Sequence, residues 1–319
     1  MNTKTMRIGL VDIDGHNFPN LALMKLSAWH KSQGDSVEFA DPMFGQYDRV
    51  YMSKVFTFTP DCPDIYHCEV IRGGTGFRDY TTVLPEEIEH ICPDYSLYGV
   101  KEAYGFLTRG CVNRCPWCIV PTKEGGIRPA SPIREFIGKQ HSAVLLDNNV
   151  LASDFGLEQI EEIIRMGIAV DFNQGLDARR ACDDPYILDM LARVKWIRHI
   201  RFACDTRAQL EPVKKCITEL ERRGVGRYRF FIYCLVKDIE DALYRINIFR
   251  EMRINPFAQP YRDFENKIEP TKEQRHLANW CNKKTVFYSC KYNDFKPYRY
   301  NLNSTPQPSG NKLLIDITR

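Results

Sequence analysis

The sequence predicts an α/β fold, in which a small strand–helix–strand domain precedes six further strand–helix repeats. Two observations predict this class. Short continuous apolar runs, typical of buried parallel strands, recur along the chain, and apolar residues at helical spacing lie between them. In the second part of the chain, the predicted strands end repeatedly in polar residues. We therefore expect parallel sheets whose carboxyl edges carry functional side chains.

The first predicted domain spans residues 1–100. Its elements are a buried strand over 7–12, a helix over 19–32, and further strands over 36–39, 48–56 and 69–72. Strand, helix and strand at this spacing suggest a small Rossmann-like α/β domain. The loop after the first strand carries Asp14, His16 and Asn17, which lie where open parallel sheets bind ligands.

The second predicted domain spans residues 101–265. After a strand-like segment at 104–108, strands are expected over 142–149, 169–175, 200–205, 229–236 and 255–260, and helices over 156–166, 185–193, 211–223 and 239–252. Repeats of this kind form a partial (βα)6, TIM-like barrel with active residues at the carboxyl ends of its strands. Residues 266–319 are predicted as a C-terminal extension, with a helix over 271–280 and an aromatic, basic stretch over 291–300.

The strand-like segment at 104–108 leads into a cysteine motif. Cys111, Cys115 and Cys118 follow a C-x3-C-x2-C spacing. Three thiolates on a tight loop can bind three irons of a [4Fe–4S] cluster and leave the fourth iron open. A structural zinc site would need a fourth ligand, usually from a second paired knuckle, and no second knuckle follows. A disulfide would leave one thiol over, so the cluster is the favoured interpretation.

The stretch from Gly105 to Cys118 closely resembles the cluster loop of the radical S-adenosylmethionine (radical SAM) enzymes. In that family the open iron is chelated by the amino and carboxylate groups of S-adenosyl-L-methionine (SAM). The resemblance implies reductive cleavage of SAM to a 5′-deoxyadenosyl radical, which abstracts hydrogen from a substrate. It also implies a one-electron donor such as flavodoxin. The sequence does not indicate whether the substrate is a small molecule, a peptide or a nucleic acid.

By position, the resemblance also implies roles for individual residues. Asp147, Asn148 and Asn149 follow the second strand and are expected to bind the SAM amino group. Other contacts to SAM are expected from Trp117 at the adenine, Asp205 at the ribose or carboxylate, and Arg207 at the carboxylate. The candidate catalytic residues are the densest polar group of the barrel, Asn173, Gln174, Asp177 and Arg179. A turn held by an Asp–Arg ion pair is the alternative for this group.

The first domain resembles the cobalamin-binding domain that precedes some radical SAM enzymes. Asp14-Gly15-His16 and Gly73-Gly74 fit the signature of that domain, whereas Asn17-Phe18-Pro19 replaces its glycine. Cobalamin is therefore not favoured, and we expect Asp14 and His16 to form hydrogen bonds within their own loop. Two alternatives stay open: a cobalamin-dependent radical SAM methyltransferase, and a non-catalytic, metal-bearing module that binds nucleic acid through the basic stretch.

Composition agrees with metal chemistry in a reducing compartment. Lys and Arg total 44 against 41 Asp and Glu, so the overall charge gives no bias toward polyanions. The twelve cysteines are too sparse for a disulfide scaffold. An apolar run at residues 8–11 is cut short by Asp12, and no apolar run is long enough to span a bilayer. We expect a cytoplasmic protein without a membrane partner, in which Cys62, Cys68 and Cys92 are unpaired thiols.

Overall fold

The computed structural model describes residues 5–15, 17–263 and 266–296. His16 and the C-terminal extension beyond residue 296 lie outside the described residues. The described chain is a mixed α/β protein with parallel sheets, and it divides into two compact units. Of the described residues, unit 1 takes those up to 103 and 135–140, and unit 2 takes 104–134 and those between 141 and 296. Within the described part of the chain, no helix is both long and apolar enough to cross a membrane.

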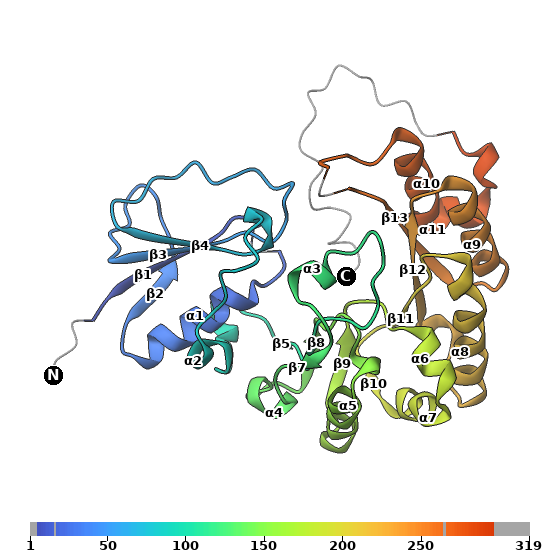
Figure 1. Ribbon diagram of the computed structural model, residues 1–319, viewed down its shortest axis with the longest axis horizontal. Coiled ribbons are helices and arrows are strands. Elements are labelled where there is room, and N and C mark those ends of the chain that lie inside the picture. The colour runs from blue at the N-terminus through green and yellow to red at the C-terminus, as the bar shows by residue number, and fades with distance from the viewer. Residues whose placement is uncertain (1–4, 16, 264–265, 297–319) are drawn as a thin grey trace. The chain divides into compact units, whose positions relative to one another are not determined.

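Unit 1 is a four-stranded parallel sheet with helices on one face (Figure 1). Its elements are β1 (Arg7–Asp12), α1 (Leu21–Ser32), β2 (Ser36–Phe39), β3 (Arg49–Ser53), β4 (Glu69–Gly73) and the short helix α2 (Glu86–Glu89). The strand order is β2-β1-β3-β4, and each neighbouring pair is parallel. Asn20 caps α1 by accepting a hydrogen bond from the Leu23 amide (3.3 Å). The apolar face of α1, with Leu23 and Leu26, then packs on Ile8 and Leu10 of β1.

Unit 2 begins with a short strand and an irregular region. The elements of this region are β5 (Ala103–Gly105), β6 (Thr108–Arg109), α3 (Val120–Lys123), β7 (Arg128–Pro129) and α4 (Ile133–Phe136), whose last two residues belong to unit 1. Strands β6 and β7 pair antiparallel, with Thr108 opposite Pro129 and Arg109 opposite Arg128. This two-stranded ladder joins the two ends of the predicted cysteine loop. The sequence does not predict this ladder, because a strand of two residues has no periodicity.

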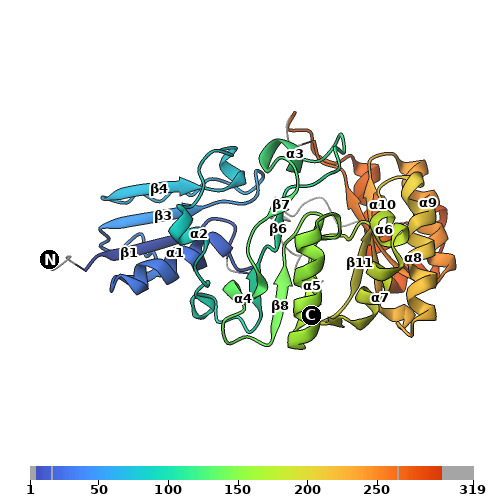
Figure 2. The ribbon, with the colours of Figure 1, turned by 60° about the horizontal axis from the view of Figure 1, so that its bottom comes forward.

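The rest of unit 2 alternates strands and helices. The elements are β8 (Ser142–Leu145), α5 (Asp154–Met166), β9 (Ala169–Phe172), α6 (Ala178–Asp183), α7 (Pro185–Arg193), β10 (Lys195–Trp196), β11 (Ile200–Ala203), α8 (Leu210–Arg222), β12 (Phe230–Val236), α9 (Ile239–Glu251), β13 (Asn255–Pro260), α10 (Lys272–Asn282) and α11 (Lys284–Ser289). They form the sheets β10-β9-β8-β5 and β11-β12-β13. A parallel bridge between Leu176 and Phe202 links the chain after β9 to β11. Helices α8 and α9 lie on the same side of the second sheet (Figure 2).

The core of unit 2 follows from its strand sequences. Strand β12 lies between β11 and β13 and is parallel to both. Its residues Phe230, Ile232 and Cys234 are completely buried. Helices with one strongly apolar face, such as α8 with Val213 and Ile217 inward, cover these strands. The carboxyl ends of the parallel strands therefore stay open to carry polar residues.

Candidate functional site

The cysteine loop leaves β6 and returns to β7, and a glycine makes this path feasible. Gly110, which directly precedes Cys111, has a φ of 78°. A Cβ built there would lie 2.1 Å from the carbonyl oxygen of Gly126, so only glycine allows the two backbone segments to approach this closely. The Cys111 amide donates to the Gly125 carbonyl (3.3 Å) on the facing segment. The first cysteine of the motif therefore has a fixed backbone position.

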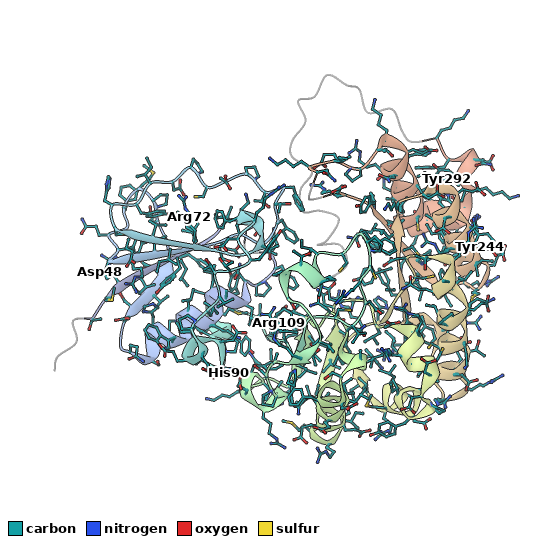
Figure 3. The ribbon with its side chains drawn as sticks, viewed as in Figure 1. Asp48, Arg72, His90, Arg109, Tyr244 and Tyr292 are labelled. Atoms are coloured by element: carbon teal, nitrogen blue, oxygen red, sulfur yellow. The ribbon has the colours of Figure 1, made fainter. Side chains whose placement is uncertain are left out.

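Glu124 holds the same region together, and no sequence pattern pointed to it. Its carboxylate accepts hydrogen bonds from the Gly110 amide (3.0 Å), from Nη1 of Arg109 (3.1 Å) and from Nδ2 of Asn148 (2.8 Å). The Glu124 side chain is only 9 % exposed. The Arg109 guanidinium, labelled in Figure 3, also lies 3.5 Å above the ring of Phe106. Glu124 thus joins the start of the cysteine loop to the end of β8.

The three loop thiols are free and lie close enough to influence one another. Cys111 and Cys115 are half-buried and Cys118 is exposed. Burial, followed by the proximity of Cys118 and Cys111, raises the pKa of the Cys115 thiol. Burial also raises the pKa of Cys118, and Cys111 again contributes. A soft metal centre would displace these protons and gain three thiolate ligands.

The donor set fits an iron–sulfur cluster better than a single ion. Among the residues that the structure describes, no three His, Cys, Asp or Glu side chains form a group that could hold a metal ion. The ligands of a zinc ion all converge on one atom. A [4Fe–4S] cluster makes a different demand, because each thiolate binds a different iron. Cys111, Cys115 and Cys118, three free thiols on one anchored loop, are the donors that would hold such a cluster.

Hydrogen bonds to sulfur and an unpartnered oxygen mark the surroundings of Cys111. The Asn113 amide (3.3 Å) and Nδ2 of Asn149 (3.5 Å) both donate to Sγ of Cys111. Such bonds stabilise negative charge on a ligating sulfur. Asn149 is 4 % exposed, and its Oδ1 has no hydrogen-bond partner among the described residues. A buried carbonyl oxygen without a partner is costly, so this atom indicates a missing hydrogen-bond donor beside the thiols.

The three polar residues that follow β8 have different surroundings. Asp147 is buried, and its carboxylate accepts from the amides of Leu107 (3.2 Å) and Thr108 (2.6 Å) and from the Thr108 hydroxyl (2.8 Å). Burial raises the pKa of Asp147 to about 6 in spite of these hydrogen bonds. Asn148 is bonded to Glu124. Of the three, Asn149 is the residue with a free acceptor next to Cys111.

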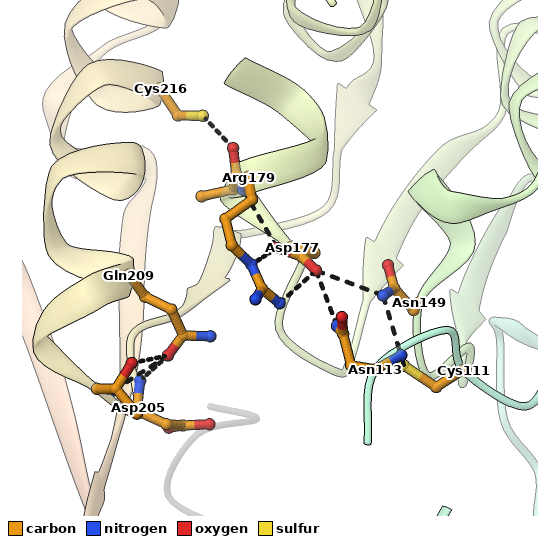
Figure 4. Close-up of polar contacts among 10 residues, drawn as sticks. Cys111, Asn113, Asn149, Asp177, Arg179, Asp205, Gln209 and Cys216 are labelled. Atoms are coloured by element: carbon orange, nitrogen blue, oxygen red, sulfur yellow. Dashed lines mark hydrogen bonds and ion pairs between the residues drawn. The ribbon is translucent and has the colours of Figure 1, made fainter. Parts of the chain in front are cut away.

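Asp177 and Arg179, from the predicted catalytic group, reach the cysteine loop (Figure 4). Oδ2 of Asp177 accepts from Nδ2 of Asn113 (2.9 Å), and Arg179 binds Asp177 through Nε (2.9 Å) and Nη2 (2.8 Å). Burial alone would raise the pKa of Asp177, but the hydrogen bonds from Arg179 and Asn113 outweigh it and lower the pKa. Asp177 also caps α6 by accepting from the Arg179 amide (3.1 Å). The predicted Asp–Arg ion pair is therefore present, and it also anchors the loop.

Asn173 and Gln174, the other two residues of the predicted catalytic group, differ from Asp177 and Arg179 in their surroundings. Asn173 offers its main-chain carbonyl to the Tyr233 hydroxyl (3.1 Å). Gln174 is exposed.

Asp205 and Arg207, which follow β11, have different partners. Oδ1 of Asp205 accepts from the Leu235 amide (3.0 Å), and burial raises the Asp205 pKa. The Asp205 charge also raises the pKa of Cys115 and Cys118, so this carboxylate is near the loop. Arg207 instead binds Asp241 (3.0 Å) and lies 4.6 Å from the ring of Tyr244, on α9 (Figure 3).

Trp117 lies near a lysine at the end of β12. Nζ of Lys237 is 6.0 Å from the Trp117 ring and 5.1 Å from the ring of Tyr261. These distances are within the range of a cation–π contact. The aromatic residue of the cysteine loop is thus close to a carboxyl strand end of unit 2.

In unit 1, the hydrogen bonds of the Asp14 carboxylate reach the loop after β3, whereas the sequence predicted hydrogen bonds within the loop of Asp14 itself. Its carboxylate accepts from the amides of Val55 and Phe56 and from the hydroxyl of Thr59 (2.6 Å). The side chain of Asp14 therefore organises the chain after β3. Cys62, Cys68 and Cys92 form no disulfide.

No protein-family model matches the chain, and no curated protein matches it.

Proposed function

We propose that the protein is a radical SAM enzyme, with a [4Fe–4S] cluster on Cys111, Cys115 and Cys118. The proposed activity is reductive cleavage of SAM to a 5′-deoxyadenosyl radical that abstracts hydrogen from a substrate. The observation that carries the proposal is the unpartnered, buried Oδ1 of Asn149 beside a loop of three free thiols. The parallel strand–helix alternation of unit 2 further supports it, as a partial (βα)6, TIM-like barrel has this order.

The residues around the loop would each have a distinct task. When bound, the cluster supplies the electron for cleavage of SAM. Oδ1 of Asn149 would accept a hydrogen bond from the SAM amino group, which is the donor that this oxygen lacks. Arg179 keeps N–H groups beyond those bound to Asp177, and these can pair with the SAM carboxylate. Asn113 and Glu124 would hold the loop in position.

The proposal names the electron donor and the substrate only as chemical classes. A one-electron donor such as flavodoxin would reduce the cluster. The radical would need a site shielded from water and stray hydrogen donors, for which the carboxyl edge of the parallel strands is the expected location.

The test compares two triple variants prepared without oxygen. One replaces Cys111, Cys115 and Cys118 with Ala, and the matched control replaces Cys62, Cys68 and Cys92, three half-buried thiols outside the loop. We expect the loop variant to lose iron, sulfide, visible absorbance and dithionite-dependent formation of 5′-deoxyadenosine, and the control to keep all four. Full iron retention in the loop variant would reject the proposal.

The same samples separate the two alternatives. Stoichiometric cobalt in the purified protein would favour a cobalamin-dependent methyltransferase. Iron without SAM binding or 5′-deoxyadenosine, together with salt-sensitive binding of nucleic acid, would favour the non-catalytic module.

A further inference from the structure

Two cysteines outside the loop lie in direct contact. Cys182 is in the last turn of α6 and Cys216 is in the middle of α8, and their Sγ atoms are 3.1 Å apart. Each thiol also donates to a carbonyl of the other helix: Cys182 to Pro212 (3.0 Å) and Cys216 to Ala178 (3.2 Å). Figure 4 includes Cys216 and this second bond. The reciprocal hydrogen bonds hold the two sulfurs facing each other.

The two thiols differ in access. Cys216 is fully buried, whereas Cys182 is only half-buried. Burial, and next the adjoining Cys182 thiol, raises the pKa of Cys216. Cys182, the less buried of the two, is therefore placed to react first with a molecule from solution, and Cys216 to resolve the product.

We propose that Cys182 and Cys216 form a redox-active pair, which closes to a reversible disulfide by exchange with a small-molecule disulfide such as oxidised glutathione. In the first step the Cys182 thiolate attacks the small disulfide, breaks its S–S bond and releases one small thiol. In the second step Cys216 loses its proton, attacks the Cys182 sulfur of the mixed disulfide and releases the second small thiol. Two electrons and two protons thus pass from the protein to the small disulfide.

The disulfide would tether a helix that belongs to the candidate site. Helix α6 has only six residues, and it is capped by Asp177, which binds both Arg179 and Asn113. Joining Cys182 to α8 restricts the opening of this short helix, because the bond closes a loop of the intervening chain. The oxidised protein would therefore hold Asp177 and Arg179 more rigidly.

The experiment equilibrates the whole protein, without oxygen, in glutathione buffers from fully reduced to fully oxidised. Free thiols are then alkylated and the protein is digested with trypsin. Cleavage after Arg180, Arg193, Lys215 and Arg222 places Cys182 in peptide 181–193 and Cys216 in peptide 216–222. The loop cysteines fall in other peptides, 110–114 and 115–123. We expect the linked pair 181–193/216–222 to accumulate as the buffer becomes oxidising and to disappear on reduction.

Variants and a second measurement make the result decisive. Cys216→Ala should trap Cys182 as its mixed disulfide with glutathione, whereas Cys290→Ser, at a half-buried cysteine outside the pair, should leave the linked peptide unchanged. On oxidation, amide exchange over residues 178–183 should slow by about tenfold or more in the wild type, and not in Cys182→Ser. Absence of the linked peptide in the most oxidising buffer, or a wild type that stops at the mixed disulfide, would overturn the proposal. Neither readout requires iron or SAM, so the result is independent of the proposed function.

Discussion

At the scale of single residues, Asn149 combines two roles in one buried amide. Its nitrogen donates to Cys111, and its oxygen has no partner among the described residues. Asn149→Ala should therefore weaken SAM binding by about 1.5–3 kcal/mol, the usual value of a hydrogen bond to a charged group, while the iron content is retained. The measurement is calorimetric titration of the iron-replete protein with SAM.

The control for this prediction is Gln174→Ala, which changes an exposed amide after the neighbouring strand β9. Unchanged SAM affinity in an iron-replete Asn149→Ala variant would show that the oxygen has another purpose.

The Asp147 carboxylate is engaged by the chain just before the cysteine loop. Its oxygens are occupied by Leu107 and Thr108, so we expect its replacement to change stability more than SAM binding. The folded-state pKa of about 6 lies above the ordinary value of 3.8. The folded state therefore holds this proton more tightly than the unfolded state does. The resulting stability is present below the unfolded pKa and is lost as pH rises through about 6.

This linkage can be measured with Asp147→Asn, which cannot ionise. The free energy of unfolding of the wild type should fall by about 2 kcal/mol between pH 4 and pH 7, relative to that of the variant. Urea titrations of both proteins across this range give the difference. Parallel curves for the two proteins would contradict the raised pKa.

At the scale of elements, a single buried arginine holds two strand ends. Arg245, on α9, is 1 % exposed, and its guanidinium donates to the carbonyls of Cys204 and Leu235 and to Asp241. Arg245→Ala should destabilise unit 2 by about 3–5 kcal/mol, because it leaves these buried acceptors without a donor. Denaturant unfolding measures the loss. The control is Arg222→Ala, whose side chain is 70 % exposed and whose loss should cost less than about 1 kcal/mol.

The elements with clear periodicity could be predicted from the sequence. The predicted strand over 7–12 is β1 and the predicted helix over 185–193 is α7. Helix α6 was not predicted, because six residues show too little of a helical repeat. The site was predictable to the same degree. Polar strand ends could be located, but the contacts of Glu124 and Asn113 join residues that no local spacing relates.

At the scale of the whole molecule, unit 1 is completed by a segment far along the chain. Residues 135–140 belong to it, although the chain between 104 and 134 belongs to unit 2. In this segment Phe136 is 3 % exposed, and its carbonyl accepts from the Tyr95 hydroxyl. The sequence predicted a domain boundary near residue 100. It did not predict that residues 135–140 belong to unit 1, because no local sequence pattern indicates that the chain comes back to a domain it has left.

Because residues 135–140 belong to unit 1, we expect the stability of unit 1 to depend on them. Phe136→Ala should destabilise unit 1 by about 3–5 kcal/mol, as large-to-small changes of buried aromatic residues do. Amide exchange in β1 and β3 should then accelerate, while exchange in β12 is unchanged. Lys139→Ala, an exposed change in the same segment, is the control. Equal protection of β1 in the wild type and Phe136→Ala would exclude a structural role for this side chain.

The anchoring of the cysteine loop has a consequence for how the protein matures in the cell. Glu124 binds Gly110 on one side of Cys111, and Asp177 binds Asn113 on the other. Fixing free backbone costs about 1–2 kcal/mol per residue, and zinc fingers meet that cost only when their metal arrives. Both anchors of the loop come from the chain itself, so the cluster that we propose would be inserted into a loop whose backbone is already held. On the proposed function, protein synthesised during iron starvation would be a pool of folded, inactive enzyme. It would gain activity when iron returns, without new translation.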